Sequence, residues 1–105
     1  MISEAACDAL SAWLATQKAL KGAAANTIDA YALDVGDFLR FITQHYGEKQ
    51  GLGALSRITT SDMRAWMAHT RGGDVSPRSL ARKLSAVKSF YRWLSEREGF
   101  EPTAV

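Results

Sequence analysis

The chain has 105 residues and a mass of 11.5 kDa, which favours one folded domain over several. Hydrophobic residues make up 47% and charged residues 23%, so the composition excludes a disordered chain, and a single cysteine, Cys7, excludes a disulfide framework. The net charge of +2 indicates no partner by itself, no apolar run approaches the roughly 18 residues of a membrane span, and we expect no signal peptide.

The first predicted element is an amphipathic helix from about residue 3 to residue 20. Ser3 is suited to cap its first turn, and Gly22 is suited to end it. Apolar residues that recur every three or four positions predict the inward face, and Leu20 is expected to lie on it.

A second helix is predicted from about residue 25 to residue 46, with an apolar stripe that includes Tyr46. Asn26 can cap this helix, although residues 23–25 can equally extend it backwards. The glycine-rich segment 47–57 that follows predicts a loop that can hold one short turn of helix.

The third helix has a sharper predicted start. Thr59 and Asp62 have the spacing of a capping box, in which a hydroxyl and a carboxylate satisfy backbone N–H groups of the first turn. Ile58 and Met63 occupy the two positions of a hydrophobic staple. Gly72-Gly73 are expected to stop this helix.

The fourth long helix is predicted from Ser76 to about Arg97. Ser76 is the expected N-cap, and Pro77 takes the first helical position, where its missing N–H costs nothing. Five apolar residues form a stripe that predicts the core side of this helix: Leu80, Leu84, Val87, Tyr91 and Leu94.

Charge is distributed unevenly along the chain. Residues 1–52 carry a net charge of −2, residues 53–105 carry +4, and residues 75–95 contain five bases and no acid. The outward face of the fourth helix carries Arg78, Arg82, Ser85, Ser89 and Arg92, with Lys83 and Lys88 at its borders. Short serines let a helix approach a groove, and arginines reach phosphates or guanine edges, so this face predicts a polyanionic partner. The alternative is a face that is merely solvated.

The outward side of the second helix is acidic instead. We interpret Asp29, Asp34 and Asp37 as solvated residues or as bridges to the arginines of a neighbouring helix. In the first turn of that helix, Asn26 and Thr27 offer neutral hydrogen-bonding groups suited to bases or phosphates.

The sequence offers no catalytic centre, and we expect no metal and no cofactor. His45 and His69 fall in no metal-ligand motif, and Cys7 has no basic neighbour that would activate it. Trp93 lies near the basic side of its helix, where it can pack on the first helix or the tail, or lie in an interface with a partner.

Two stretches of the sequence resemble a known family. Residues 26–41, with Asn-Thr followed by Tyr31, Asp34 and Phe38-Leu39, resemble the second helix of the core-binding domain of tyrosine recombinases. Residues 76–94, with Leu-Ser-Ala-Val-Lys-Ser-Phe-Tyr at their centre, are similar to the fourth helix of that domain. Together with residues 58–64 between them, the resemblance is closest to the Xer recombinases of the phage integrase family, and to their XerC branch.

The resemblance implies an all-α, SAM-like bundle of four to five helices, built from two helical hairpins packed roughly orthogonally. It implies that residues 1–98 are a DNA-binding domain and that residues 99–105 begin a linker to a catalytic domain outside this sequence. The residues expected to contact a recombination half-site of double-stranded DNA are Asn26, Thr27, Arg78, Ser79, Arg82 and Ser85, with Lys83, Lys88 and Arg92 as phosphate or partner contacts.

The resemblance also implies what the whole protein does. A XerC-like recombinase of the bacterial cytoplasm would cut and rejoin DNA with a XerD-like partner and resolve chromosome dimers, while this part performs no chemistry. Ala24 stands where the family often has a serine, and the second helix is more acidic than usual. The sequence leaves two alternatives: a helical protein-interaction module and a helix-turn-helix regulator.

Overall fold

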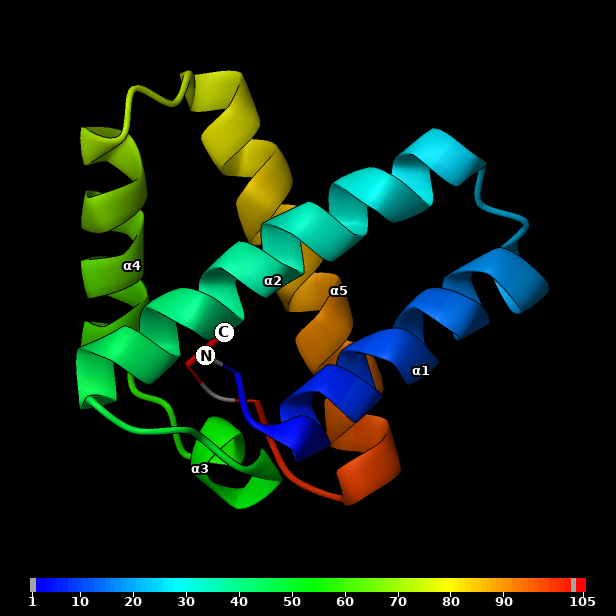
Figure 1. Ribbon diagram of the computed structural model, residues 1–105, viewed down its shortest axis with the longest axis horizontal. Coiled ribbons are helices and arrows are strands. Elements are labelled where there is room, and N and C mark those ends of the chain that lie inside the picture. The colour runs from blue at the N-terminus through cyan, green and yellow to red at the C-terminus, as the bar shows by residue number, and fades with distance from the viewer. Residues whose placement is uncertain (1, 103) are drawn as a thin grey trace.

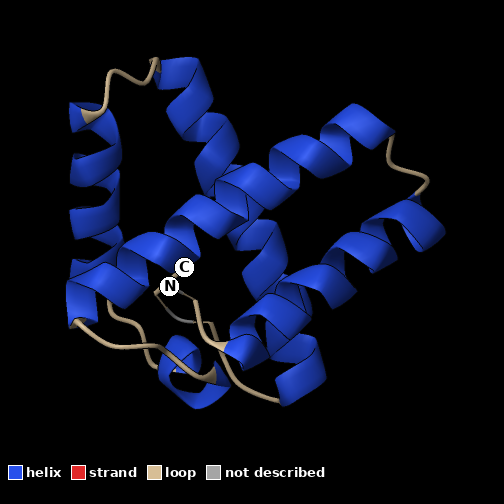
Figure 2. Cartoon of the chain, in the orientation of Figure 1, coloured by secondary structure: helices blue, strands red, loops and turns tan. Residues whose placement is uncertain are grey.

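Helices and their connections make up the chain in the computed structural model, which describes residues 2–102 and 104–105 (Figure 2). Within these residues there is no strand, so the all-α prediction is confirmed. The five helices are α1 (Glu4–Lys21), α2 (Ala25–Tyr46), α3 (Leu52–Ser56), α4 (Thr60–Gly72) and α5 (Pro77–Glu98). The short turn of helix expected between residues 47 and 57 is α3.

Three of the predicted helix starts are confirmed in detail. The hydroxyl of Ser3 accepts a hydrogen bond from the backbone N–H of Ala6 at the start of α1, and Ser76 does the same for Ser79 at the start of α5. At α4, Thr59 and Asp62 form both bonds of the capping box. Each cap satisfies a backbone donor that the helix itself leaves without a partner.

The start of α2 differs from these three. Its N-cap is Ala24, which has no side-chain hydrogen bond to give, and Asn26 lies inside the first turn. The preceding helix ends at Gly22, whose φ of +62° is a left-handed conformation that glycine adopts at little cost. Asn26 is therefore not the cap, and its exposed side chain is available for other partners.

The helices form two hairpins that cross (Figure 1). α1 and α2 run antiparallel, α4 and α5 form the second hairpin, and α5 passes behind α2 and α1. α3 lies in the connection between the hairpins. This arrangement confirms the predicted crossing of two hairpins.

Aromatic side chains fill the space where the hairpins cross. Phe38 of α2 meets Trp66 of α4 and Tyr91 of α5 edge to face, with ring centroids 5.2 and 6.0 Å apart. Trp13 of α1 meets Phe90 of α5 at 5.5 Å, and all five rings are buried. Edge-to-face contacts of this kind add to the free energy gained from burial alone.

The core stripe of α5 is nearly as predicted. Leu80, Val87 and Leu94 are buried, whereas Leu84 is only half-buried. Two inward predictions on the first hairpin are wrong, because Leu20 is 81% exposed and Tyr46 is 46% exposed. Leu20 lies in the last turn of α1, and the ends of α1 and α2 that meet at Gly22 extend beyond the crossing with α5 (Figure 1). Tyr46 lies at the opposite end of α2, where its hydroxyl donates to Asp62 of α4.

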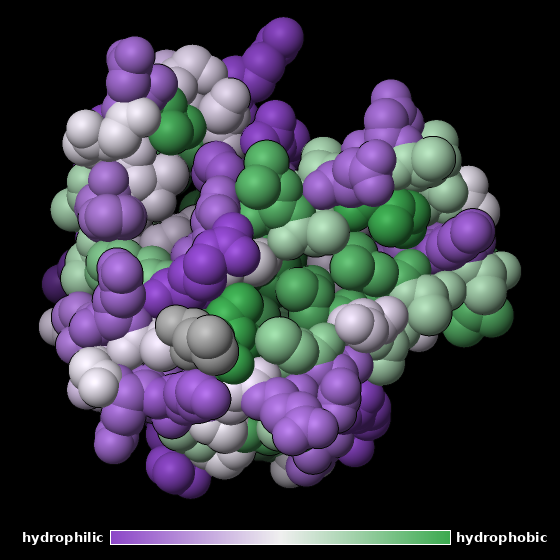
Figure 3. All heavy atoms as spheres, in the orientation of Figure 1, coloured by the Kyte–Doolittle hydropathy of each residue, from purple (hydrophilic) through white to green (hydrophobic). Residues whose placement is uncertain are grey.

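The face of the molecule shown in Figure 3 gathers apolar side chains over the α1–α2 hairpin. The exposed Leu20 and Leu33 belong to this hairpin. In the segment after α5, Phe100 lies against Tyr91, with ring centroids 6.4 Å apart, and both Phe100 and Val105 pack on the core. Two residues of the predicted linker, Phe100 and Val105, thus lie against the domain, and the boundary at residue 98 stays a prediction.

Candidate nucleic-acid interface

The residues predicted to contact DNA come together on α5, apart from the two at the start of α2. Most of the α5 group point outward, because they lie opposite the stripe that packs in the core, mainly against α2 and α1. The exposed members are Arg78, Arg82, Ser85, Lys88 and Arg92, while Ser79 is half-buried. At the start of α2, Asn26 is exposed and Thr27 is half-buried.

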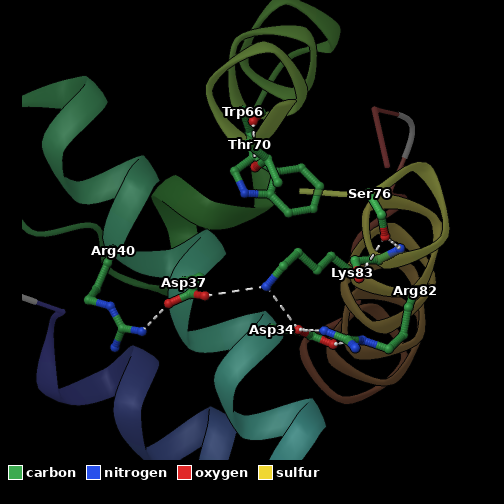
Figure 4. Close-up of polar contacts among 9 residues, drawn as sticks. Asp34, Asp37, Arg40, Trp66, Thr70, Ser76, Arg82 and Lys83 are labelled. Carbon is green, nitrogen blue, oxygen red and sulfur yellow. Dashed lines mark hydrogen bonds and ion pairs between the residues drawn. The ribbon is translucent and has the colours of Figure 1, made fainter. Parts of the chain in front are cut away.

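Arg82 is bound to a carboxylate that is completely buried. Its Nε–H donates to Oδ2 of Asp34 and its Nη2–H to Oδ1, each over 3.0 Å. The side chain of Asp34 has no exposed surface, while that of Arg82 remains 50% exposed (Figure 4). The hydrogen bonds that Arg82 donates to Asp34 raise the pKa of Arg82, with a further contribution from the charge of Asp34. This two-point bond joins α2 to α5 and fixes the plane of the guanidinium.

Lys83, the next residue along α5, approaches the same carboxylate (Figure 4). Its Nζ lies 3.1 Å from Oδ1 of Asp34 and 3.4 Å from Oδ2 of Asp37, and its side chain is only 12% exposed. Arg40 also pairs with Asp37, one turn away on α2. Lys83 therefore points into the contact between α2 and α5, whereas the resemblance assigned it to a phosphate or a partner.

These ion pairs change the meaning of the acid-free stretch in residues 75–95. The counter-charges for Arg82 and Lys83 come from Asp34 and Asp37 on another helix, so only part of the basic excess remains uncompensated. Among the residues that the structure describes, the cations of the outward face without an ion pair are Arg78, Lys88 and Arg92. The predicted bridge from an α2 acid to an arginine of a neighbouring helix is confirmed for Asp34, whereas Asp37 pairs with Lys83 of α5 and with Arg40 of its own helix.

The N-terminus of α5 is occupied by its own capping bonds. The backbone N–H of Ser79 donates to Oγ of Ser76, and the hydroxyl of Ser76 donates to that of Ser79, each over 3.1 Å. Ser79 thus takes part in the cap, so its hydroxyl has one bond already made before any DNA contact.

A cleft of about 380 Å³ opens beside the ion pairs, between α2, α4 and α5. Trp66 and Phe41 give it aromatic walls, and His69 lies at the wall with its ring 5.0 Å from that of Phe41. No group of three or more His, Cys, Asp or Glu able to hold a metal ion occurs among residues 2–102 and 104–105. The cleft has no nucleophile paired with a base.

Asp62 forms a second polar cluster that the sequence showed only in part. Besides its capping bonds, its carboxylate accepts a hydrogen bond from the hydroxyl of Tyr46, and Nε2 of His45 lies 3.1 Å away. Burial alone would raise the pKa of Asp62, but the hydrogen bonds from Tyr46, Thr59 and His45 outweigh burial and lower it. The hydrogen bond between Tyr46 and Asp62 also raises the pKa of Tyr46. The capping motif predicted the Thr59 contact, whereas nothing in the spacing indicated Tyr46 or His45.

Trp93 packs against the core, and its aromatic and cation contacts are with residues of α5 itself, so its packing on the first helix or the tail stays a prediction. Its ring is half-buried, with the centroid 6.1 Å from that of Phe90, and the guanidinium of Arg97 lies 4.8 Å above it. A cation over an aromatic face is weakly attractive, which stabilises the last turns of α5.

Comparison with known proteins identifies the family of this bundle. Residues 10–98 match the model of the phage integrase N-terminal SAM-like domain. The chain is similar to proteins named tyrosine recombinase XerC: 39% identical over 87 residues to that of Nitrobacter winogradskyi, 37% over 90 to that of Bradyrhizobium diazoefficiens, and 40% over 92 to that of Methylobacterium nodulans. These matches cover 83, 86 and 88% of this chain but only 27–28% of the relatives. No solved structure gave a match. The chain belongs to the phage integrase N-terminal SAM-like domain family.

Proposed function

We propose that the chain binds double-stranded DNA through the outward face of α5. The observation that carries this proposal is the set of cations on this face that have no ion pair among the described residues, Arg78, Lys88 and Arg92, with the short Ser85 between them. A helix of 22 residues spans about 33 Å. A major groove admits one such helix, and cations on its exposed face meet phosphates on either side.

In this proposal Asn26 and Thr27 contribute a smaller part of the DNA contact. They lie at the start of α2, where backbone N–H groups of the first turn have no partner inside the helix. Ala24 gives no capping bond there, so a phosphate can take that place. Arg82 joins the contact with the part of its guanidinium that Asp34 leaves exposed, whereas Lys83 supports the helix pair from within.

The names of the relatives support a wider proposal for the whole protein. We infer that this domain positions a recombination half-site for a XerC-like tyrosine recombinase, whose catalytic residues lie outside the chain and cut and rejoin DNA. That protein would work with a XerD-like partner in the bacterial cytoplasm and resolve chromosome dimers. In the described residues no helix is long and apolar enough to cross a bilayer.

Fluorescence anisotropy with a labelled duplex of about 30 base pairs, at 50–200 mM salt, tests the DNA contact. We expect log Kd to rise with log salt, with a slope of about 0.9 per phosphate contact. The triple variant Arg78→Ala/Lys88→Ala/Arg92→Ala should weaken binding and flatten the slope. The control Lys18→Ala/Lys21→Ala/Lys49→Ala removes the same charge from exposed positions in the first half of the chain.

The proposal is wrong if both triple variants lose the same affinity, since binding would then depend only on net charge. If the chain does not bind the labelled duplex even at 50 mM salt, the result favours the protein-interaction alternative, in which the α5 face binds an acidic protein. The helix-turn-helix alternative has lost its support, because the family match extends over both hairpins.

A further inference from the structure

We infer that Asp34 is a positioning residue for DNA recognition, which holds the guanidinium of Arg82 in one orientation on the outward face of α5 before DNA arrives. This inference rests on the proposed function, since it assigns a role within the same surface. It concerns a residue that contacts no DNA itself, because Asp34 is fully buried between α2 and α5.

The geometry of the pair fixes Arg82 in two respects. The two parallel hydrogen bonds to Oδ1 and Oδ2 hold the guanidinium plane and also its rotation within that plane. They use Nε–H and one N–H of Nη2, so the remaining N–H groups stay free for another acceptor. Because half of the Arg82 side chain is exposed, these remaining donors can reach a phosphate or a base edge.

The charges explain why this pairing does not cancel the attraction of Arg82 for DNA. Asp34 binds two cations, Arg82 and Lys83, with its single negative charge. Lys83 is nearly buried and suffices to neutralise the carboxylate, so a net positive charge remains at the exposed Arg82. Asp37, shared between Lys83 and Arg40, does not contact Arg82.

Arg78 and Arg92 provide the contrast on the same face. Each has no ion pair among the described residues and must lose its rotamer freedom when DNA binds. Ordering one such side chain costs about 2- to 12-fold in affinity. Arg82 is already ordered by Asp34, so its contact avoids that loss.

The sign of one substitution tests the inference. Asp34→Asn keeps the shape of the side chain and removes a negative charge, so electrostatics alone predicts tighter DNA binding. If Asp34 positions Arg82, Asp34→Asn should instead weaken duplex binding by about 2- to 12-fold, despite the gain in net charge. Asp37→Asn is the matched control, since it removes the same charge from α2 without touching Arg82, and it should bind equally well or slightly more tightly.

A double-substitution cycle separates positioning from a general loosening of the fold. Arg82→Ala alone should weaken binding by about 5- to 150-fold. In that background Asp34→Asn should cause no further loss, since the group that it positions is gone. A further loss in the Arg82→Ala background would show that Asp34 acts through the helix pair as a whole, which overturns the inference.

A measurement on the unchanged chain covers the case in which Asp34→Asn fails to fold. We expect ¹⁵N relaxation of the arginine side chains to show a rigid Nε–H for Arg82 in free protein and mobile ones for Arg78 and Arg92. An Arg82 as mobile as Arg78 overturns the inference. A different result contradicts the proposed function itself, namely that the unchanged chain binds no duplex. If the chain binds but Arg82→Ala has no effect, only the role of Arg82 and Asp34 is refuted.

Discussion

Two buried carboxylates join the two hairpins at different places and by different chemistry. Asp34, on α2, is held by the cations Arg82 and Lys83 of α5. Asp62, on α4, receives its hydrogen bonds from its own helix start and from Tyr46 at the end of α2, with His45 alongside. The first contact is an ion pair between distant segments, and the second extends a local cap into a tertiary contact.

The two contacts differ in the groups that lose a partner when the carboxylate is removed. The partners of Asp34 are charged, and the nearly buried Lys83 would lose its shorter ion pair and keep only the longer one with Asp37. The partners of Asp62 are a backbone N–H, a phenol and an imidazole, and Tyr46 is exposed enough for water to replace the bond. Asp34 should therefore matter more for stability, although both side chains are buried.

The largest expected effect is that of Asp34→Ala. It should lower the free energy of unfolding by about 3 kcal/mol, because the nearly buried Lys83 keeps only its longer contact with Asp37 and Arg82 loses both of its hydrogen bonds. Urea unfolding followed by circular dichroism measures this loss. Asp37→Ala, at a half-exposed carboxylate of the same cluster, should cost less than about 1 kcal/mol. Equal losses would mean that burial of the pair is energetically irrelevant.

Asp62→Ala should have the next largest effect. Loss of the capping box and of the contact with Tyr46 should lower the free energy of unfolding by about 1–2 kcal/mol. Thr59→Ala removes the other half of the cap, and if it costs as much as Asp62→Ala, then the bonds to α2 contribute nothing. Urea unfolding at pH 7 compares the two variants.

The same contrast explains how far the sequence predicts the structure. The capping box, the serine caps and the apolar stripe of α5 depend on neighbours within one turn, so spacing reveals them. The pairing of Asp34 with Arg82 spans 48 positions, and the sequence allowed it only as one of two interpretations of an acidic helix face. Lys83 shows what a single helix cannot predict. A helical wheel of α5 places Lys83 at the border of the basic face, but it cannot show that α2 lies at that border.

Low pH should weaken the Asp62 contact in a predictable direction. The folded protein holds the pKa of Asp62 below its ordinary value of 3.8. A carboxylate with a lowered pKa in the folded state stabilises the protein above its unfolded pKa, and this contribution is lost as pH falls through the folded value. We therefore expect the free energy of unfolding of the natural chain to exceed that of Asp62→Asn most near pH 6. The difference should shrink below pH 3.8 when urea unfolding is followed from pH 6 to pH 2.5. A constant difference would contradict a lowered pKa.

The smallest expected effect is that of Tyr46→Phe, which removes only the hydroxyl that donates to Asp62. Because the ring is 46% exposed, the loss at pH 7 should stay below about 1 kcal/mol. The bond needs a protonated phenol, and its pKa is raised above 10.0 in the folded state, so the contribution is present below pH 10 and lost as pH rises through the folded value. Burial also raises the pKa of Tyr91. Because Tyr91 is present in the natural protein and in Tyr46→Phe, its titration cancels in the difference between their free energies of unfolding. If the difference in free energy of unfolding persists above the pKa of Tyr46, then it does not come from the hydrogen bond that the protonated phenol donates to Asp62.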